Sequence, residues 1–200
     1  MTHPEQPPDR SWNPHRFSTL AEAQKWIDLQ SQAWHLLLTD KERQAAVAYK
    51  GRQHKEINGL LPGDLRLPPG DEARVKKLIW QLDAAIAKAS IPVDLLLYRG
   101  IYASPKEYHV GKIQVEDGYS STTLNPKLAH RWAAGPDGEP GLVFEIHAPA
   151  GTPAGFPDRL GIFEEQLEVL LEHGTMLWVT AIRPPLTPSA HTVVVADLVR

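Results

Sequence analysis

The chain has 200 residues, a formal net charge of −3 at pH 7 and no cysteine. This length is enough to bury one sizeable core, so no second domain is required. The lack of cysteine excludes disulfides, thiolate metal ligands and a cysteine nucleophile. The small negative charge argues against nonspecific adhesion to nucleic acid or to an anionic membrane, and no apolar stretch is long enough to span a bilayer. The nine histidines show no metal-ligand spacing, so no metal site is expected.

Residues 1–17 are polar and rich in proline, without an apolar run behind a positive start. We therefore expect a disordered leader and no secretory signal. Helical periodicity follows over residues 18–90. Thr39 and Glu42 have the spacing of a capping box before a helix from Asp40 to Lys50, which Gly51 ends, and Glu72 to Ala89 forms an amphipathic helix.

After Pro92 the pattern changes to short apolar runs separated by glycine and proline, which is typical of strands. Helices first and strands afterwards predict an α+β fold for a single domain over residues 18–200. Its helical lead-in would cover residues 18–90 and its β-rich core residues 91–200. The expected strands are Leu95–Tyr98, Gln114–Thr123, Gly141–His147, Glu168–Leu171, Met176–Ile182 and Thr192–Leu198.

Polar side chains alternate with apolar ones where residues 163–168 run into the strand at Glu168. In an extended chain Gln166 and Glu168 share one face, while Leu167 and Val169 enter the core. A carboxylate with an amide beside it can form a reaction centre. A strand edge decorated with solvated carboxylates is the simpler alternative.

Two earlier segments add charged and hydroxyl groups. The strand at Leu95 ends at Arg99, whose planar guanidinium suits a diphosphate, and Gly100 after it lets a flat ligand approach the backbone. Residues 118–124 place four hydroxyl side chains, Ser120 to Thr123, between aromatic and apolar neighbours. Each segment alone is weak evidence for a site, because such residues are ordinary at strand ends and in strands.

An arginine that ends a strand, a hydroxyl-rich strand about twenty residues later and a Gln-x-Glu about fifty residues beyond resemble the mono-ADP-ribosyltransferase exoenzymes of the Arg-Ser-Glu class. The segments Leu38–Arg43, Tyr49–Gly51, Glu56–Leu61 and Leu82–Ile86 are similar to the family's helical lead-in. The likeness extends over residues 18–183, and several short motifs in the right order are far more specific than one. The resemblance implies a mixed or antiparallel core of two small sheets at an angle, with NAD as co-substrate in the cleft between them.

The resemblance also implies roles for the site residues. Glu168 would stabilise the positive charge that develops on the ribose of NAD, and Ser121 would orient Glu168. Arg99 would hold the diphosphate, and the backbone of Gly100 would bind the nicotinamide amide. Trp132 would cover the nicotinamide, although a core or surface tryptophan is an equal alternative. The further NAD contacts implied are Asn58 and Thr122.

Gln166 would face the acceptor. In the family a glutamine at this position accompanies modification of asparagine or glutamine, or of guanine bases, whereas a glutamate accompanies arginine. An amide can both donate to and accept from another amide, so an amide acceptor is favoured. Phe163 would press on the acceptor surface, with an ordinary core phenylalanine as the alternative. The chain departs from the family pattern at Pro62, where relatives commonly carry a phosphate-binding arginine. This loss puts the affinity for NAD in question unless Arg66 or Arg131 reaches into the site.

The resemblance therefore predicts an NAD-dependent mono-ADP-ribosyltransferase that acts as a bacterial or phage toxin or effector. Its partner would be a protein of a target cell, with nucleic acid not favoured, no membrane partner and an immunity protein left open. Delivery would not use an N-terminal signal peptide, and otherwise the protein would stay in the cytoplasm. The alternatives are an NAD glycohydrolase, modification of arginine or of a nucleic-acid base, and a catalytically dead binding module. A catalytically dead binding module is disfavoured because Arg99, Ser121 and Glu168 are all present.

Overall fold

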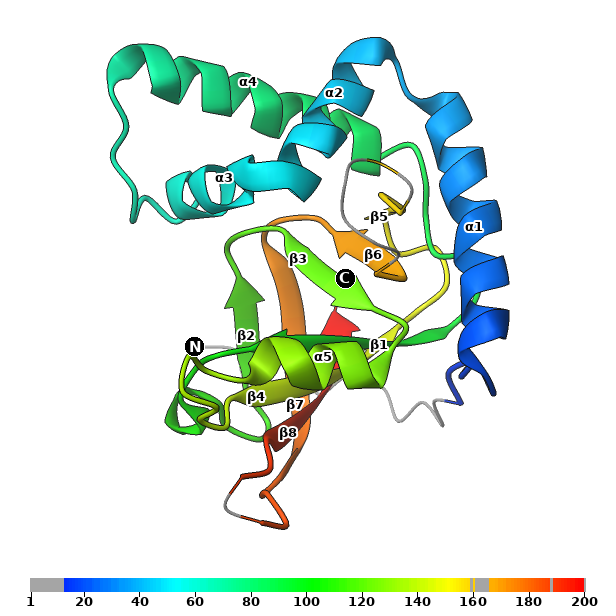
Figure 1. Ribbon diagram of the computed structural model, residues 1–200, viewed down its shortest axis with the longest axis vertical. Helices are drawn as coiled ribbons and strands as arrows, with labels where there is room; N and C mark the ends of the chain where they lie inside the picture. The colour runs from blue at the N-terminus through cyan, green and yellow to red at the C-terminus, as the bar shows by residue number, and fades with distance from the viewer. Residues whose placement is uncertain (1–12, 159, 161–165, 188, 200) are drawn as a thin grey trace, which may run out of the picture.

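The computed structural model describes residues 13–158, 160, 166–187 and 189–199. Helices come first along the chain and strands afterwards, so the predicted α+β order is confirmed. Figure 1 shows the helices beside and above the sheet, with one short helix lying across the sheet. The helices are α1 (Leu20–Leu37), α2 (Asp40–Ala48), α3 (His54–Leu60), α4 (Pro69–Ile86) and α5 (Pro126–Ala133), with a π-helical turn η1 (Tyr49–Gln53) and a 3-10 turn η2 (Pro105–Glu107).

The capping box predicted for α2 is present. The Thr39 hydroxyl accepts from the backbone N–H of Glu42, and the Glu42 carboxylate accepts from the backbone N–H of Thr39 at 2.6 Å. The regular helix ends at Ala48, two residues before the predicted end, because η1 begins at Tyr49. Within η1, Gly51 leaves helical geometry with ψ near −129°. This break ends the helix close to where the sequence placed it and turns the chain toward α3.

The strands form one continuous hydrogen-bonded sheet in the order β2-β7-β8-β4-β1-β3-β6-β5. The pair β4 and β8 is parallel and the other pairs are antiparallel, so the sheet is mixed. The expected single strand from Gln114 to Thr123 is wrong: it is divided into β2, which pairs with β7, and β3, which pairs with β6. The strands are β1 (Leu95–Ile101), β2 (Ile113–Glu116), β3 (Ser120–Thr123), β4 (Leu142–Ala148), β5 (Ala154–Gly155), β6 (Glu168–Leu171), β7 (Thr175–Arg183) and β8 (Thr192–Val199).

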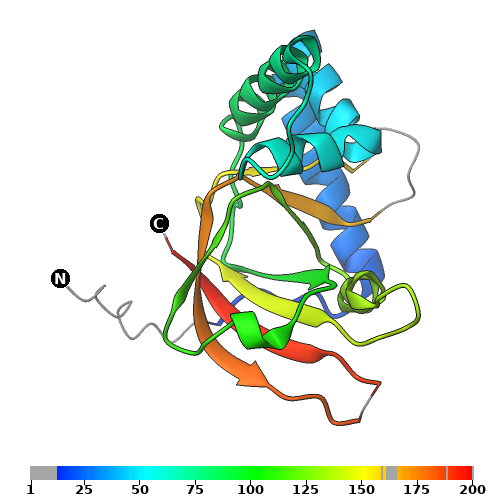
Figure 2. The same cartoon turned by 90° about the vertical axis from the view of Figure 1, so that its left-hand side faces the viewer.

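The sheet has a narrow junction between β1 and β3. These strands share a single register pair, Tyr98 with Thr123, whereas β1 and β4 share seven. On one side of the junction β3, β6 and β5 lie next to α2, α3 and α4, and on the other side β4, β8 and β7 lie farther from these three helices (Figures 1 and 2). The two expected sheets are thus two parts of one sheet that meet at an angle.

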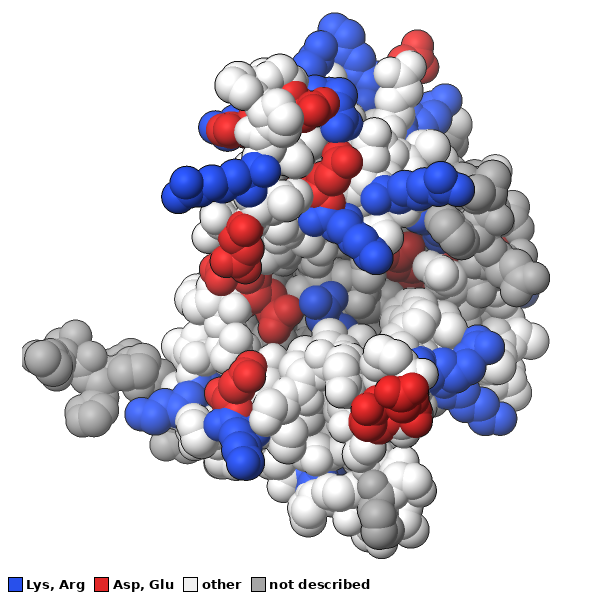
Figure 3. Space-filling view, turned by 60° about the vertical axis from the view of Figure 1, so that its left-hand side comes forward, with Lys and Arg blue, Asp and Glu red and all other residues white. Residues whose placement is uncertain are grey.

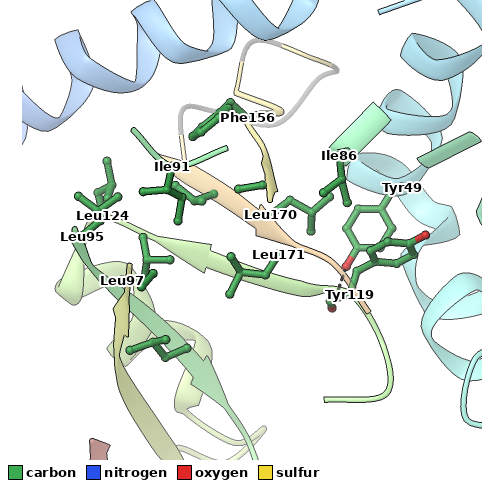
Figure 4. Close-up of a cluster of buried hydrophobic side chains, with 14 of the residues drawn as sticks. Tyr49, Ile86, Ile91, Leu95, Leu97, Tyr119, Leu124, Phe156, Leu170 and Leu171 are labelled. Atoms are coloured by element: carbon green, nitrogen blue, oxygen red, sulfur yellow. Dashed lines mark hydrogen bonds between the residues drawn. The ribbon is translucent and has the colours of Figure 1, made fainter. Parts of the chain in front are cut away.

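Helices and strands share one hydrophobic core. Figure 4 shows Leu95 and Leu97 of β1 and Leu170 and Leu171 of β6 in one cluster of buried apolar side chains. Ile86 of α4 belongs to the same cluster. The Trp34 indole N–H of α1 donates to the Ala85 carbonyl of α4 at 2.8 Å, which fixes two helices over this core. The helical lead-in is therefore packed as part of the same body as the strands.

The packed domain begins at an earlier residue than the sequence predicts. The backbone N–H of His15 donates to the Asp94 carbonyl at 2.8 Å, and the backbone N–H of Leu96 donates to the His15 carbonyl at 3.2 Å. The Phe17 ring lies 5.6 Å from the ring of Trp26. Residues 13–17 therefore belong to the packed domain, and the predicted leader boundary at residue 17 is too late. Residues 1–12 lie outside the described part of the chain. Among the described helices none is long and apolar enough to cross a membrane.

Candidate active site

A cavity of about 340 Å³ opens at the narrow junction of the sheet. Strands β1, β3 and β6, helix α5 and the turn η1 all contribute to its walls. Figure 3 shows the molecular surface hollowed between the helical layer and the sheet, with acidic and basic side chains close together along the hollow. The lining residues are Tyr49, Lys50, Gly51, His54, Arg99, Gly100, Ile101, Ser121, Trp132, Gln166 and Glu168.

Glu168 is the first residue of β6 and is 3% exposed. Burial raises its pKa above the ordinary value, and the neighbouring Asp158 carboxylate acts in the same direction, whereas Lys50 and a hydrogen bond from Ser121 oppose the increase. The Glu168 Oε2 atom is buried and makes no hydrogen bond, although Lys50 Nζ lies 3.4 Å away in an ion pair. A buried carboxylate oxygen with unused hydrogen-bonding capacity beside a cavity can accept a ligand hydroxyl.

Arg99 lies on β1 and lines the same cavity as Glu168. Its Nη1 donates to the Ser121 carbonyl at 3.3 Å, and its Nη2 lies 3.2 Å from Glu116 Oε2. These two contacts hold the guanidinium against β3 and β2. The Nε atom is buried without a partner, so the fork retains a donor for an anionic ligand.

The turn before Glu168 differs from the extended chain that the sequence suggested. Leu167 has a φ of 51°, so residues 166–168 do not alternate as in a strand, and β6 begins only at Glu168. Thr123 donates its hydroxyl to the Gln166 carbonyl at 2.7 Å, which holds the turn. Gln166 and Glu168 nevertheless both line the cavity, while Leu167 and Val169 are buried in the core. Phe163, Glu164 and Glu165 lie outside the described residues.

Two of the residues expected to contact NAD, Thr122 and Asn58, do not line the cavity. The Thr122 hydroxyl is buried and donates to the Val169 carbonyl at 2.6 Å, because alternate residues of β3 face opposite sides and Ser121 has the cavity side. The Asn58 amide is used within the protein, where it accepts from the Tyr119 N–H and donates to the Tyr119 carbonyl. Trp132 of α5 does line the cavity and is partly exposed.

Gly100 lines the cavity with its backbone, but the reason for a glycine differs from the expected one. A Cβ at this position would lie 1.8 Å from the Ala129 carbonyl oxygen. The space that a side chain would need is occupied by helix α5. Gly100 therefore lets α5 pack directly on β1 and brings Trp132 to the rim.

The sequence did not reveal the wall that faces these strands. Tyr49, Lys50 and His54 line the cavity from η1 and α3. Behind them Asp158, which is 0% exposed, accepts from the backbone N–H groups of Leu167 and Glu168 at 2.9 and 3.2 Å. In the sequence, the Tyr49-Lys50-Gly51 segment is similar to the helical lead-in of the family, which predicts no role in the cavity. The available signal is a glycine that interrupts a helix beside a lysine. Nothing around Asp158 distinguishes it from an ordinary loop carboxylate.

Other basic side chains could replace the phosphate-binding arginine that is absent at Pro62. Neither Arg66 nor Arg131 lines the cavity, and both are exposed. The basic residues that do line it are Lys50, His54 and Arg99. Within the described residues no group of three or more His, Asp or Glu side chains is placed to hold a metal ion.

Comparison with known proteins assigns the chain to a family. The ADP-ribosyltransferase exoenzyme family matches residues 23–199, nearly the whole chain, and the chain belongs to this family. Membership defines the class of enzyme, a transferase that takes ADP-ribose from NAD. Two similar sequences are named mono-ADP-ribosyltransferase C3. The one from Clostridium botulinum C phage is 22% identical over 92% of this chain and 80% of the relative, and the one from Hathewaya limosa is 24% identical over 92% and 78%.

Solved structures show the same fold. The C3 exoenzyme of Clostridium limosum superimposes with a TM-score of 0.79 at 24% identity, covering 94% of this chain and 98% of that one. Plx2a, an ADP-ribosyltransferase toxin from Paenibacillus larvae, gives 0.75 at 24% identity over 94% and 99%. C3stau2 from S. aureus, solved with NAD, gives 0.70 at 21% identity over 94% and 99%. At these identities the likeness establishes the architecture, and the roles of individual residues depend on the geometry above.

Proposed function

We propose that this enzyme transfers ADP-ribose from NAD to the side-chain amide of an asparagine or glutamine in a protein of a target cell, and releases nicotinamide. The observation that carries the proposal is the convergence of Arg99, Ser121, Gln166 and Glu168 on one cavity from three separate parts of the chain. A fold shared with known transferases would not by itself require these four side chains to meet.

The reaction needs little acid catalysis. The bond between nicotinamide and ribose breaks with its electron pair going to the ring nitrogen, which is cationic in NAD and becomes neutral. Positive charge then develops on the ribose, and the Glu168 carboxylate stabilises it, because its Oε2 has no other hydrogen bond. The acceptor nitrogen forms the new bond to the ribose carbon and releases a proton.

Two residues prepare this step. The Ser121 hydroxyl hydrogen-bonds Glu168 and so fixes the direction of its carboxylate. The Arg99 guanidinium, held by the Ser121 carbonyl and by Glu116, offers its free Nε to the diphosphate of NAD. Trp132, which also lines the cavity, would cover the nicotinamide. In this proposal Asn58 and Thr122 act only indirectly, by fixing the strand that carries Ser121.

The acceptor preference rests on Gln166, whose side chain belongs to the cavity lining. An amide can donate to one atom and accept from the other atom of a second amide, whereas a guanidinium prefers a carboxylate. Action as a delivered toxin is part of the proposal, because one structural neighbour is itself described as a toxin. Neither the contacts of the cavity nor the comparisons support an immunity protein, which is therefore not included.

The test is to incubate the protein with labelled NAD and a eukaryotic cell lysate, beside a Glu168→Ala control. Label on a protein band that the control lacks supports transfer. Free ADP-ribose without labelled protein would indicate an NAD glycohydrolase. Label on nucleic acid would indicate a nucleic-acid acceptor in place of a protein. Intact NAD would indicate a binding module. Mass spectrometry of the labelled band identifies the modified side chain. A labelled arginine would overturn the role given to Gln166, and Gln166→Glu is the variant expected to favour arginine.

A further inference from the structure

A buried lysine lies between two buried carboxylates beside the cavity. The Lys50 Nζ is 3.1 Å from Asp158 Oδ1 and 3.4 Å from Glu168 Oε2. The three side chains are 2%, 0% and 4% exposed, so water does not screen them. They come from η1, from the loop after β5 and from the start of β6, which are far apart in the sequence.

The charges of this triad depend on Lys50. With all three groups ionised the net charge is −1, and without the lysine it would be −2 in a buried site. Two adjacent buried carboxylates do not both remain ionised, and one of them retains a proton. The backbone N–H groups of Leu167 and Glu168 both donate to Asp158, and such hydrogen bonds favour a charged carboxylate. The proton would therefore go to Glu168.

Other groups that face Glu168 do not replace this cation. Ser121 of β3 contributes a hydroxyl, and Gln166 contributes a neutral amide. Burial raises the pKa of Tyr49, so this neighbour in η1 stays a neutral phenol. Arg99 of β1 is ion-paired with Glu116 at 3.2 Å, and His54 of α3 has its Nδ1 atom 2.9 Å from the Gly51 carbonyl oxygen. Within the described part of the chain, Lys50 is the cation in direct contact with the Glu168 carboxylate.

We propose that Lys50 is a positioning residue that keeps Glu168 ionised and directed into the cavity at neutral pH. The proposal rests on the proposed function for its catalytic consequence, but the ionisation of Glu168 can be measured without any activity. Lys50 also fixes η1 to the turn before β6 through Asp158, so the helical wall and the reacting carboxylate move as one unit. A protonated Glu168 could not stabilise positive charge on the ribose.

Four versions of the full chain separate this charge role from a merely structural one. Lys50→Met removes the cation and leaves two carboxylates. Asp158→Asn leaves Lys50 beside Glu168 alone. The double variant Lys50→Met/Asp158→Asn returns the site to a net charge of −1 without the lysine. The fourth version is the unaltered protein, and circular dichroism checks that each variant is folded.

The measurement is a ¹³C NMR titration of the Glu168 side-chain carboxyl, assigned by the signal that Glu168→Gln loses. We expect the titration midpoint to rise in Lys50→Met, to fall in Asp158→Asn and to return toward that of the unaltered protein in the double variant. The acid limb of kcat for NAD cleavage should move in the same order with little change in KM. For Lys50→Met we expect kcat at pH 7 to fall about tenfold or more, because each unit by which the midpoint passes the assay pH leaves tenfold less carboxylate.

An unchanged Glu168 midpoint in folded Lys50→Met, or a double variant no better than the single one, would overturn the proposal. If Lys50→Met does not fold, the Asp158→Asn titration still decides, since a midpoint that fails to fall would contradict the charge balance. Midpoints that move as expected while no version cleaves NAD would overturn the proposed function and leave the charge role of Lys50 standing.

Discussion

The two walls of the cavity are built in different ways. Arg99, Ser121 and Glu168 lie on three strands, where backbone pairing such as Thr123 with Glu168 fixes their positions. The opposite wall consists of η1 and the start of α3, which are held by side chains, above all Lys50 on Asp158. In our proposals the strand wall places the reacting groups, and the helical wall sets their charge.

This difference separates two kinds of variant. A conservative change on the strand wall should alter the rate and leave the fold, because the backbone ladder does not depend on the side chain. A change in the side chains that join the walls should alter stability or ionisation. A residue that both lines the cavity and is buried, such as Glu168, should show both effects.

The largest effect is expected for Glu168→Gln. The amide keeps the shape of the carboxylate but cannot balance a positive charge on the ribose, so kcat for NAD cleavage should fall by at least about a thousandfold, or several kcal/mol. Steady-state assays of nicotinamide release measure this, with NAD affinity from isothermal titration as the companion. Loss of affinity with an unchanged kcat would mean that Glu168 binds NAD without acting in the reaction.

The same variant should be more stable than the unaltered protein at neutral pH. The pKa of Glu168 is raised in the folded state, mainly by burial, so the folded protein favours the protonated form more than the unfolded chain does. This contribution to stability is fully present below the unfolded pKa of 4.5 and is lost as pH rises through the higher folded pKa. Glu168→Gln avoids that loss. Urea denaturation should therefore show the variant more stable than the unaltered protein at pH 7, with the difference shrinking as pH falls toward 4.5. A difference independent of pH would contradict this.

Gly100→Ala tests the contact between the strand wall and α5. The new methyl group would meet the Ala129 carbonyl at 1.8 Å, so α5 must move, at a cost of about 1–3 kcal/mol of unfolding free energy. Trp132 would move with the helix, and KM for NAD should rise. Gly70→Ala is the matched control, because a Cβ there has nothing within 4 Å and the site is at the start of α4. Equal stability of the two variants would show that α5 is not packed as described.

The role of Gly100 also shows where sequence reasoning stops. The resemblance to the exoenzyme family implies that Arg99, Ser121 and Glu168 belong together, whereas the strand ends and the side-chain alternation leave each segment as weak evidence alone. The packing of α5 against Gly100 is a tertiary contact that no local pattern reveals. Lys50 and Asp158 are 108 positions apart, and each alone looks like an ordinary charged residue. The prediction of one strand from Gln114 to Thr123 overlooks Asp117 and Gly118, a pair that is typical of turns and that separates β2 from β3.

The smallest effects are expected from two adjacent residues of β3 that face opposite sides. Ser121→Ala removes the hydrogen bond that orients Glu168, so kcat should fall about five- to tenfold, or roughly 1 kcal/mol, with unchanged unfolding. Thr122→Val removes the buried bond to the Val169 carbonyl and should lower stability by about 1–3 kcal/mol, with kcat unchanged. Urea denaturation and nicotinamide release on both variants measure this contrast. If both variants lost rate and stability together, β3 would not separate the reacting face from the packed face, and the strand wall would be no more independent of its side chains than the helical wall.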